Sequence, residues 1–187
     1  MKKTTMIILG LIAVIVIIGA MVGGSYNSLV SKEEKVEKEF SNIDIQLERR
    51  AELIPNLVNT VKGYAKHETE VIERVTTARE NLLKANNTEE KSDANNELTS
   101  ALNALMVIVE KYPDLKANHN FIQLSDELPR TENRIATSRR DYNEAVTSYN
   151  TAVKKFPTNI LASIFGFEKK AYFEVSEGNE KVPEVNF

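Results

Sequence analysis

Residues 121–156 read FIQLSDELPRTENRIATSRRDYNEAVTSYNTAVKKF, and this stretch decides the fold. Its apolar and small residues recur at alternating steps of three and four, the spacing of one face of an α-helix. We call such a row of residues a seam, and here it comprises Phe121, Leu124, Leu128, Thr131, Ile135, Ser138, Tyr142, Ala145, Tyr149, Ala152 and Phe156. A seam this regular predicts a long helix that packs at a shallow angle against antiparallel partners, as in a helical bundle.

Two features of this stretch go beyond its seam. Tyr142-Asn143 recurs one heptad later as Tyr149-Asn150. We expect the tyrosines to lie in the core, with the asparagines beside them in hydrogen bonds between helices. Pro129 predicts a kink or a missing backbone hydrogen bond inside the helix.

Three further seams precede this one in the chain. The first seam is Val36, Phe40, Ile43, Leu47, Ala51 and Ile54. It predicts a helix that starts with Ser31 and Glu34 as a capping box. Alternatively, this helix continues from the segment before it. The second seam is Leu57, Val61, Tyr64, Glu68, Val71, Val75, Ala78 and Leu82. The third ends before Pro113 and comprises Leu98, Leu102, Leu105 and Val109. Residues 86–93 are polar and predict a loop, with Thr88 or Ser92 as the next helix cap.

Pro55 leaves two arrangements open. Proline is favourable in the first turn of a helix, so Pro55 could begin a second helix that folds back as a hairpin. Alternatively, one kinked helix runs through Pro55, since no glycine marks a turn there.

Residues 6–24 form a run of 19 residues without a charge. At about 1.5 Å per residue the run spans about 28 Å, close to the thickness of the hydrocarbon core of a bilayer. A cleaved signal peptide is the alternative, but the run is long for one, so we expect an uncleaved membrane anchor. Lys2 and Lys3 favour a cytoplasmic N-terminus and a domain outside the cytoplasm, whereas Lys32, Lys35 and Lys38 on the other flank oppose this orientation. The predicted organisation is a short tail (1–5), a transmembrane helix (6–24), a helical bundle (25–157) and an aromatic-rich tail (158–187).

Composition excludes several function classes. The 187 residues include 24 Lys plus Arg and 27 Asp plus Glu, so the chain lacks the basic excess that nucleic-acid binding requires. There is no cysteine, and therefore no disulfide or thiolate site. His67-Glu68 begins a zinc-protease motif, but Val71 stands where its second histidine is needed. We expect no metal, no cofactor and no enzyme activity, because the residues fill none of the catalytic roles.

Several short segments, taken together and in this order, resemble the LemA family. They include residues 49–58 (RRAELIPNLV), 61–64 (VKGY), 112–118 (YPDLKAN), 132–135 (ENRI) and 156–157 (FP). His67-Glu68, Ala78-Arg79, Asn120-Phe121 and the two Tyr-Asn pairs also match. The resemblance covers roughly residues 26–173 and implies a bacterial membrane-anchored protein with an up-and-down four-helix bundle. It therefore favours the hairpin at Pro55. Pro129 departs from the family pattern.

The resemblance implies no catalytic residues and links the family to envelope functions and membrane proteases. We therefore expect a non-catalytic scaffold or adaptor in the cell (inner) membrane, whose partner is an envelope or membrane protein such as a membrane protease. The alternatives are a self-assembling membrane-organising protein, which would form homo-oligomers, and, more remotely, a membrane-tethered hydrolase.

Three groups of residues are candidate sites. In a four-helix hairpin arrangement, the corner around Pro55 and the corner around Pro113 meet at one tip of the bundle. We expect this tip to bind the partner protein, unless the two motifs serve only as turns. Its residues are Arg49, Arg50, Glu52, Pro55, Asn56, Tyr112, Pro113, Asp114, Lys116 and Asn118. Glu68 lies on a seam and predicts a buried ion pair with Arg139 or Arg79. The tail residues Phe165, Phe167, Lys169, Lys170, Tyr172 and Phe173 suit the lipid headgroup region, unless the tail folds back onto the bundle.

Overall fold

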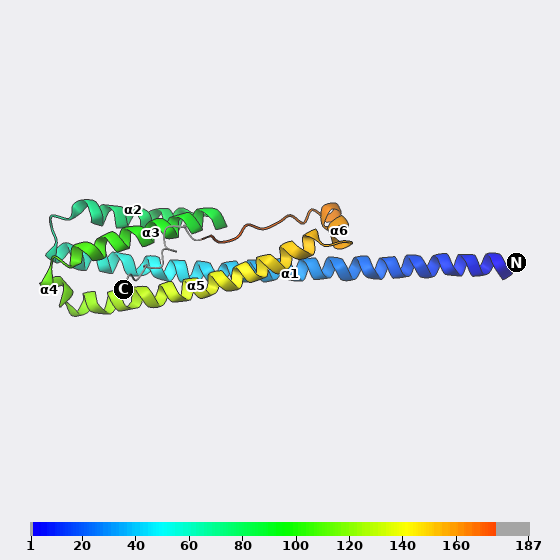
Figure 1. Cartoon of the computed structure of the whole chain (residues 1–187), viewed down its shortest axis with the longest axis horizontal. Coiled ribbons are helices and arrows are strands. Elements are labelled where there is room, and N and C mark those ends of the chain that lie inside the picture. Colours follow the sequence, from blue (N-terminus) through cyan, green and yellow to red (C-terminus); the bar gives the residue numbers. More distant parts are fainter. Residues whose placement is uncertain (1, 175–187) are drawn as a thin grey trace, which may run out of the picture. The chain divides into compact units, whose positions relative to one another are not determined.

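The computed structural model describes residues 2–174, and all of its regular structure in that range is helical (Figure 1). Its elements, in chain order, are α1 (Lys2–Tyr64), α2 (Thr69–Lys84), α3 (Thr88–Val109), α4 (Pro113–Lys116), α5 (His119–Lys154) and α6 (Thr158–Phe165). The prediction of an all-α fold with a long apolar N-terminal helix is confirmed. The last residues of the predicted tail, 175–187, lie outside the described range.

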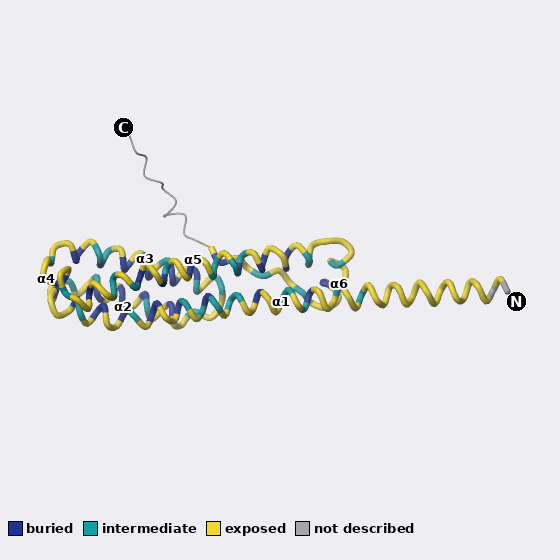
Figure 2. Tube along the Cα trace, turned by 90° about the horizontal axis from the view of Figure 1, so that it is seen from below, coloured by how far each residue is buried: buried dark blue, intermediate teal, exposed yellow. Residues whose placement is uncertain are grey.

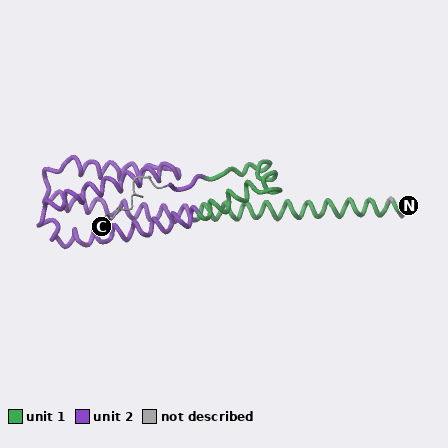
Figure 3. Tube along the Cα trace, in the orientation of Figure 1, with its two compact units in different colours: residues 1–38, 144–170 green, residues 39–143, 171–187 purple. Residues whose placement is uncertain are grey.

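The chain divides into two compact units (Figure 3). Residues 1–38 and 144–170 form unit 1, and residues 39–143 and 171–187 form unit 2. Helices α1 and α5 each contribute to both units, because the division falls within them.

Unit 2 is the helical bundle. The ion pair between Arg49 and Glu127 joins α1 to α5, and the ring of Phe40 lies 5.8 Å from that of Tyr142. The residue numbers fall on α5 as they rise on α1, so these two helices are antiparallel. Asp44 of α1 binds Lys91 of α3, and Arg50, further along α1, binds Asn95, further along α3. The residue numbers rise together, so α1 and α3 run in the same direction. Helices α1, α2, α3 and α5 thus alternate up and down, as predicted.

Helix α1 continues through Pro55 to Tyr64, so the hairpin at Pro55 is wrong. The seam steps from Ile54 to Leu57 and Val61 without a change of phase, and all three side chains are buried. The chain turns back only at residues 65–68, after the exposed Tyr64. This continuity of phase joins the first and second seams across the proline, as a single helix requires.

The hydrogen bond that Pro55 cannot make is replaced by a side chain. Proline has no N–H, which leaves the carbonyl four residues earlier, that of Ala51, without its helical donor. Arg79 of α2 donates from Nε to the Ala51 oxygen at 2.8 Å. This bond ties α2 to α1 at the site of the proline, and it gives Arg79 a role that differs from the predicted pairing with Glu68.

The core follows the predicted seams except for part of the second one (Figure 2). The chain turns at residues 65–68 within that seam, so Tyr64 is 43% exposed, and Ile72 is buried where the seam predicted Val71. Along α5 the seam residues are buried or half-buried from Phe121 to Ala152, and the helix passes through Pro129. Phe156 is the exception, because it is 75% exposed.

Two predicted boundaries are wrong. Ser31 and Glu34 do not start a helix, because α1 is continuous from the apolar run through Gly23 and Gly24. The predicted loop 86–93 is shorter in the structure, since α3 begins at Thr88, where the Asn87 side chain accepts a hydrogen bond from the Glu90 N–H. Asparagine is as good an N-cap as the residues that we expected.

Unit 1 holds the membrane candidate. Within residues 2–174, α1 is the one helix that is long and apolar enough to cross a bilayer. Its most apolar segment is not buried by the rest of the protein. The end of α5 and helix α6 belong to the same unit.

Candidate functional site

The residues predicted to form one tip lie in two separate places of unit 2. Pro55, Glu52 and Asn56 are exposed on the continuous helix α1 and form no corner. Tyr112, Pro113, Asp114, Lys116 and Asn118 do form a corner, around the single turn α4 between α3 and α5. The reason is the path of α1, which continues for two more turns beyond Pro55.

The corner around α4 meets the turn between α1 and α2 instead. The Tyr112 hydroxyl donates to Glu68 Oε1 at 3.0 Å, and the Asn118 amide donates to the Tyr64 hydroxyl at 3.0 Å. The hydrogen bond to Glu68, with smaller effects of burial and of the carboxylate charge, raises the pKa of Tyr112. Residues 64–68 and 112–118 therefore form one end of the bundle, which we call the bundle end.

Two further residues of the corner serve the turn itself. The side-chain oxygen Oδ1 of Asn118 accepts a hydrogen bond from the Phe121 N–H at 3.1 Å and so caps α5. Lys116 and Glu110 form an exposed ion pair at 2.6 Å. Such exposed pairs contribute little to stability.

The predicted ion pair between Glu68 and Arg139 is not formed, because Glu68 binds Tyr112. Glu68 and Arg139 are each half-buried.

A buried ionic group of unit 2 is Arg50, which is 4% exposed. Its Nη1 lies 2.6 Å from Asn95 Oδ1 and 2.6 Å from Glu132 Oε2. Burial lowers the pKa of Arg50, and the charge of Glu132 opposes this effect.

This polar cluster was missed in the sequence, although a signal was present. Arg50 lies three residues after Leu47 on the buried face of α1, and Asn95 precedes Leu98 at the same spacing on α3. A polar side chain at such a position must find a partner in the core. Arg49, by contrast, is half-exposed and pairs with Glu127 at the surface.

The two asparagines of the Tyr-Asn pairs bind the extended chain after α6. Asn150 donates to the Lys170 carbonyl and accepts from the Lys170 N–H, at 2.9 and 3.0 Å, within unit 1. Asn143 does the same for Phe173 within unit 2, at 3.0 and 2.9 Å. A primary amide matches the backbone donor and acceptor of an extended residue.

The tail residues have different surroundings. Phe173 is 2% exposed and belongs to the core of unit 2. Lys170 pairs with Glu33 at 2.8 Å, so its charge is already partnered inside unit 1. Phe165 and Phe167 make edge contacts with Tyr26, with ring centroids 5.0 and 5.7 Å apart. Tyr172 and Lys169 are exposed. Within residues 166–174, Phe167, Lys170 and Phe173 thus contact the protein, whereas the other residues are exposed.

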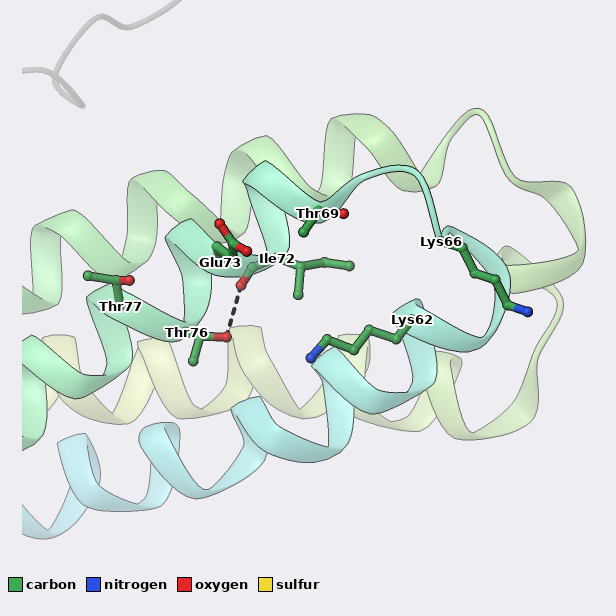
Figure 4. Close-up of a pocket in the computed structure, with 7 residues that line it drawn as sticks. All are labelled: Lys62, Lys66, Thr69, Ile72, Glu73, Thr76 and Thr77. Atoms are coloured by element: carbon green, nitrogen blue, oxygen red, sulfur yellow. Dashed lines mark hydrogen bonds between the residues drawn. The ribbon is translucent and has the colours of Figure 1, made fainter.

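Unit 2 has two open grooves near the bundle end. Groove A has a volume of about 550 Å³ and lies between the end of α1 and the start of α2 (Figure 4); its lining is Lys62, Lys66, Thr69, Ile72, Glu73, Thr76 and Thr77. Groove B has a volume of about 520 Å³ and lies between α1 and α5; its lining is Leu53, Asn56, Asn59, Thr60, Asn120, Gln123, Leu124 and Glu127. Of the predicted tip residues, Asn56 lines groove B.

Groove A combines an apolar floor with cationic and hydroxyl groups. Ile72 is 4% exposed and forms the floor. Figure 4 shows the Lys62 side chain lying along α1 below α2, whereas Lys66 points away from the groove. Among the described residues neither lysine has an ion pair, so the Lys62 ammonium group is available to a ligand in the groove and that of Lys66 to a ligand at its outer edge. Acidic side chains and carbonyl oxygens are the groups that such a lining would bind.

Residues 2–174 hold no group of three or more His, Asp or Glu side chains placed to bind a metal ion. His67 and His119 are both exposed.

These features define a class: a helical bundle carried by a long helix with an apolar N-terminal run that is suited to a membrane. Residues 39–187 match the model of the LemA family, and the chain belongs to that family. It is 30% identical over 175 residues to Magnetosome protein MamQ 2 of Paramagnetospirillum magneticum, covering 80% of this chain and 64% of the relative. It is also 30% identical over 159 residues to Protein LemA of Metamycoplasma hominis, covering 82% of this chain and 71% of the relative.

The chain spans less than two thirds of the length of the MamQ relatives. None of the matched names describes an enzyme. Together with the apolar run of α1, these relatives indicate a membrane-associated helical protein.

Proposed function

We propose that this protein is a membrane-anchored adaptor that binds a partner membrane protein through groove A. The observation that carries the proposal is the lining of the groove, where Lys62 lies beside three threonines over the buried Ile72. Lys66 lies at the outer edge, and Glu73 is the one acidic residue of the lining. A segment with acidic side chains would pair with the lysines, and its backbone would find hydroxyl donors beside them. An adaptor needs no catalytic group, only an anchor and a binding surface.

The expected orientation places the N-terminus in the cytoplasm and the bundle outside it, in the inner membrane. Lys2 and Lys3 precede the apolar run and favour their side as cytoplasmic, whereas Lys32, Lys35 and Lys38 on the other flank oppose this orientation. The chain contains no cysteine, so Val107→Cys introduces a single thiol at an exposed position of α3. Labelling by a membrane-impermeant maleimide in intact spheroplasts supports this orientation; labelling only after lysis contradicts it.

The adaptor proposal is tested by cross-linking in cells. A photoreactive amino acid replaces Thr69 or Thr77, which are exposed in groove A, and the captured proteins are identified by mass spectrometry. The same membrane protein should be captured from both positions.

Charge reversal then tests the role of the lysines. Lys62→Glu with Lys66→Glu should abolish the capture, because the lining becomes acidic. The matched control is Lys111→Glu with Arg134→Glu, which makes the same change of charge at exposed positions outside the groove. Capture that survives the groove variant, or that is lost equally in the control, contradicts the proposal. Capture of this chain alone favours the alternative of a self-assembling protein.

A further inference from the structure

Helix α6 carries an exposed apolar face. Ile160 and Ile164 are one turn apart and are 52% and 68% exposed, and Phe165 is 50% exposed. Phe156, just before the helix, is 75% exposed. Leu161 and Ala162 face the protein instead, since Leu161 is half-buried and Ala162 is 1% exposed. Large apolar side chains gathered in this way indicate an interaction surface.

Within unit 1, α6 lies against the apolar run of α1 (Figure 3). A cavity of about 200 Å³ between them is lined by Ile18, Met21, Val22 and Ser25 of α1, and by Pro157, Ile160 and Leu161. Three of the four α1 residues belong to the run 6–24 that is suited to the hydrocarbon core. Side chains that share a cavity with Ile18 and Met21 lie at the same depth as these residues.

The geometry of α1 gives this depth. The apolar run ends at Gly24, six residues after Ile18. At about 1.5 Å per residue, Ile18 lies about 9 Å inside the end of the run. Interfacial helices bury their apolar face about 5–10 Å into the boundary between headgroups and acyl chains. The contact with α1 therefore holds α6 at the depth that its apolar face requires.

Charges at the end of α5 are consistent with this position. Lys154 and Lys155 are exposed immediately before Phe156, and neither has an ion pair among the described residues. Lysines beside an inserted apolar segment can reach the lipid phosphates.

We infer that α6 is a second membrane contact, an interfacial helix that inserts Phe156, Ile160, Ile164 and Phe165 into the same leaflet in which the apolar run of α1 ends. We assign the bilayer as the partner of this apolar face, because the face lies beside the apolar run of α1, which itself needs a bilayer around it. The protein would then be held to the membrane at two points of unit 1, the span and α6.

The chain has no tryptophan, which allows single-tryptophan reporters in the full-length protein. Ile164→Trp reports on α6. Val107→Trp is the matched control, because Val107 is 67% exposed against 68% for Ile164 but lies on α3. Ile15→Trp, at the centre of the apolar run, shows whether the span itself is inserted. Each protein is reconstituted into phosphatidylcholine vesicles with acyl chains brominated either near the carbonyl end or near the methyl end.

The expected result is loss of Ile164→Trp emission with bromine near the carbonyl end, loss of Ile15→Trp emission with bromine near the methyl end, and no loss for Val107→Trp. An unquenched Ile164→Trp reporter beside a quenched Ile15→Trp reporter overturns the inference. A blue-shifted but unquenched reporter also overturns it, because another protein surface then covers α6. Ile160→Trp repeats the measurement if the first substitution disturbs folding.

Discussion

Pro55 and Arg79 are coupled through one backbone oxygen, that of Ala51. The proline removes the N–H that would bind this carbonyl, and the guanidinium of Arg79 supplies a donor in its place at 2.8 Å. The pair allows α1 to continue through a proline, and it joins α1 to α2 at the same position.

A double-mutant cycle tests this coupling. Arg79→Ala should reduce the free energy of unfolding by about 1–3 kcal/mol, because the Ala51 carbonyl loses its donor. In the Pro55→Ala background the same substitution should cost about 1 kcal/mol less, since the alanine N–H restores the helical bond. Stability is measured by urea unfolding of the full chain in detergent. Additive effects of the two substitutions would contradict the coupling, and Arg74→Ala, an exposed position on α2, provides the control.

Arg50 and Arg49 are neighbours with opposite surroundings, so they should differ in their contribution to stability. Arg50→Ala leaves Asn95 without its donor and Glu132 without its cation, and should cost about 3 kcal/mol. Arg49→Ala removes only an exposed pair with Glu127 and should cost less than about 1 kcal/mol. Equal losses in thermal unfolding would show that Arg50 is not the polar centre of the bundle.

Asn143 should hold Phe173 against the bundle by its two hydrogen bonds. Asn143→Ala removes both bonds and should cost about 1–3 kcal/mol. Asn143→Asp should not restore this loss, because it keeps the acceptor for the Phe173 N–H but sets a carboxylate oxygen against the Phe173 carbonyl oxygen. Hydrogen exchange at Phe173 should accelerate in the alanine variant. Asn133→Ala, at an exposed position on the same helix, is the control. Unchanged exchange at Phe173 in Asn143→Ala would mean that burial of its ring alone holds the segment.

Unit 1 should lose stability at alkaline pH. The hydrogen bond to Glu33 raises the pKa of Lys170 above its ordinary value of 10.5, although burial opposes the shift. Burial, followed by the charge of Glu33, raises the pKa of Tyr149 above its ordinary value of 10.0. A raised pKa in the folded state means that the stabilisation is complete below the ordinary pKa and is lost as pH rises through the folded value.

Glu33→Gln should therefore flatten the alkaline limb of a plot of stability against pH, because it removes the charge that acts on both groups. The measurement is thermal unfolding from pH 8 upward, followed by circular dichroism. A limb that keeps its slope in the variant would contradict the role of Glu33. Glu37→Gln serves as the control, because the charge of Glu37 is the smallest of the effects on Lys170.

The repeated Tyr-Asn pairs show what a sequence pattern can predict and what it cannot. Their spacing on α5 predicted that both tyrosines lie in the core, and Tyr142 and Tyr149 are 2% and 0% exposed. The partner of each asparagine could not be read from the pattern, because an amide can bind any donor and acceptor that the fold brings to it. Those partners, Phe173 and Lys170, lie 30 and 20 residues away in the chain.

The sequence by itself determined what depends on local order: the helical class, the seams and the apolar run. A repeat of three and four residues is the spacing of a helix face, and an uncharged stretch of 19 residues is long enough to cross a bilayer. The tertiary structure decided what depends on distant residues. Arg79 allows α1 to pass through Pro55, Asn95 and Glu132 allow Arg50 to be buried, and α6 lies beside residues 18–25 of α1. In the first two cases a group that would be costly to leave unpaired finds a partner far away in the chain, which no local pattern contains.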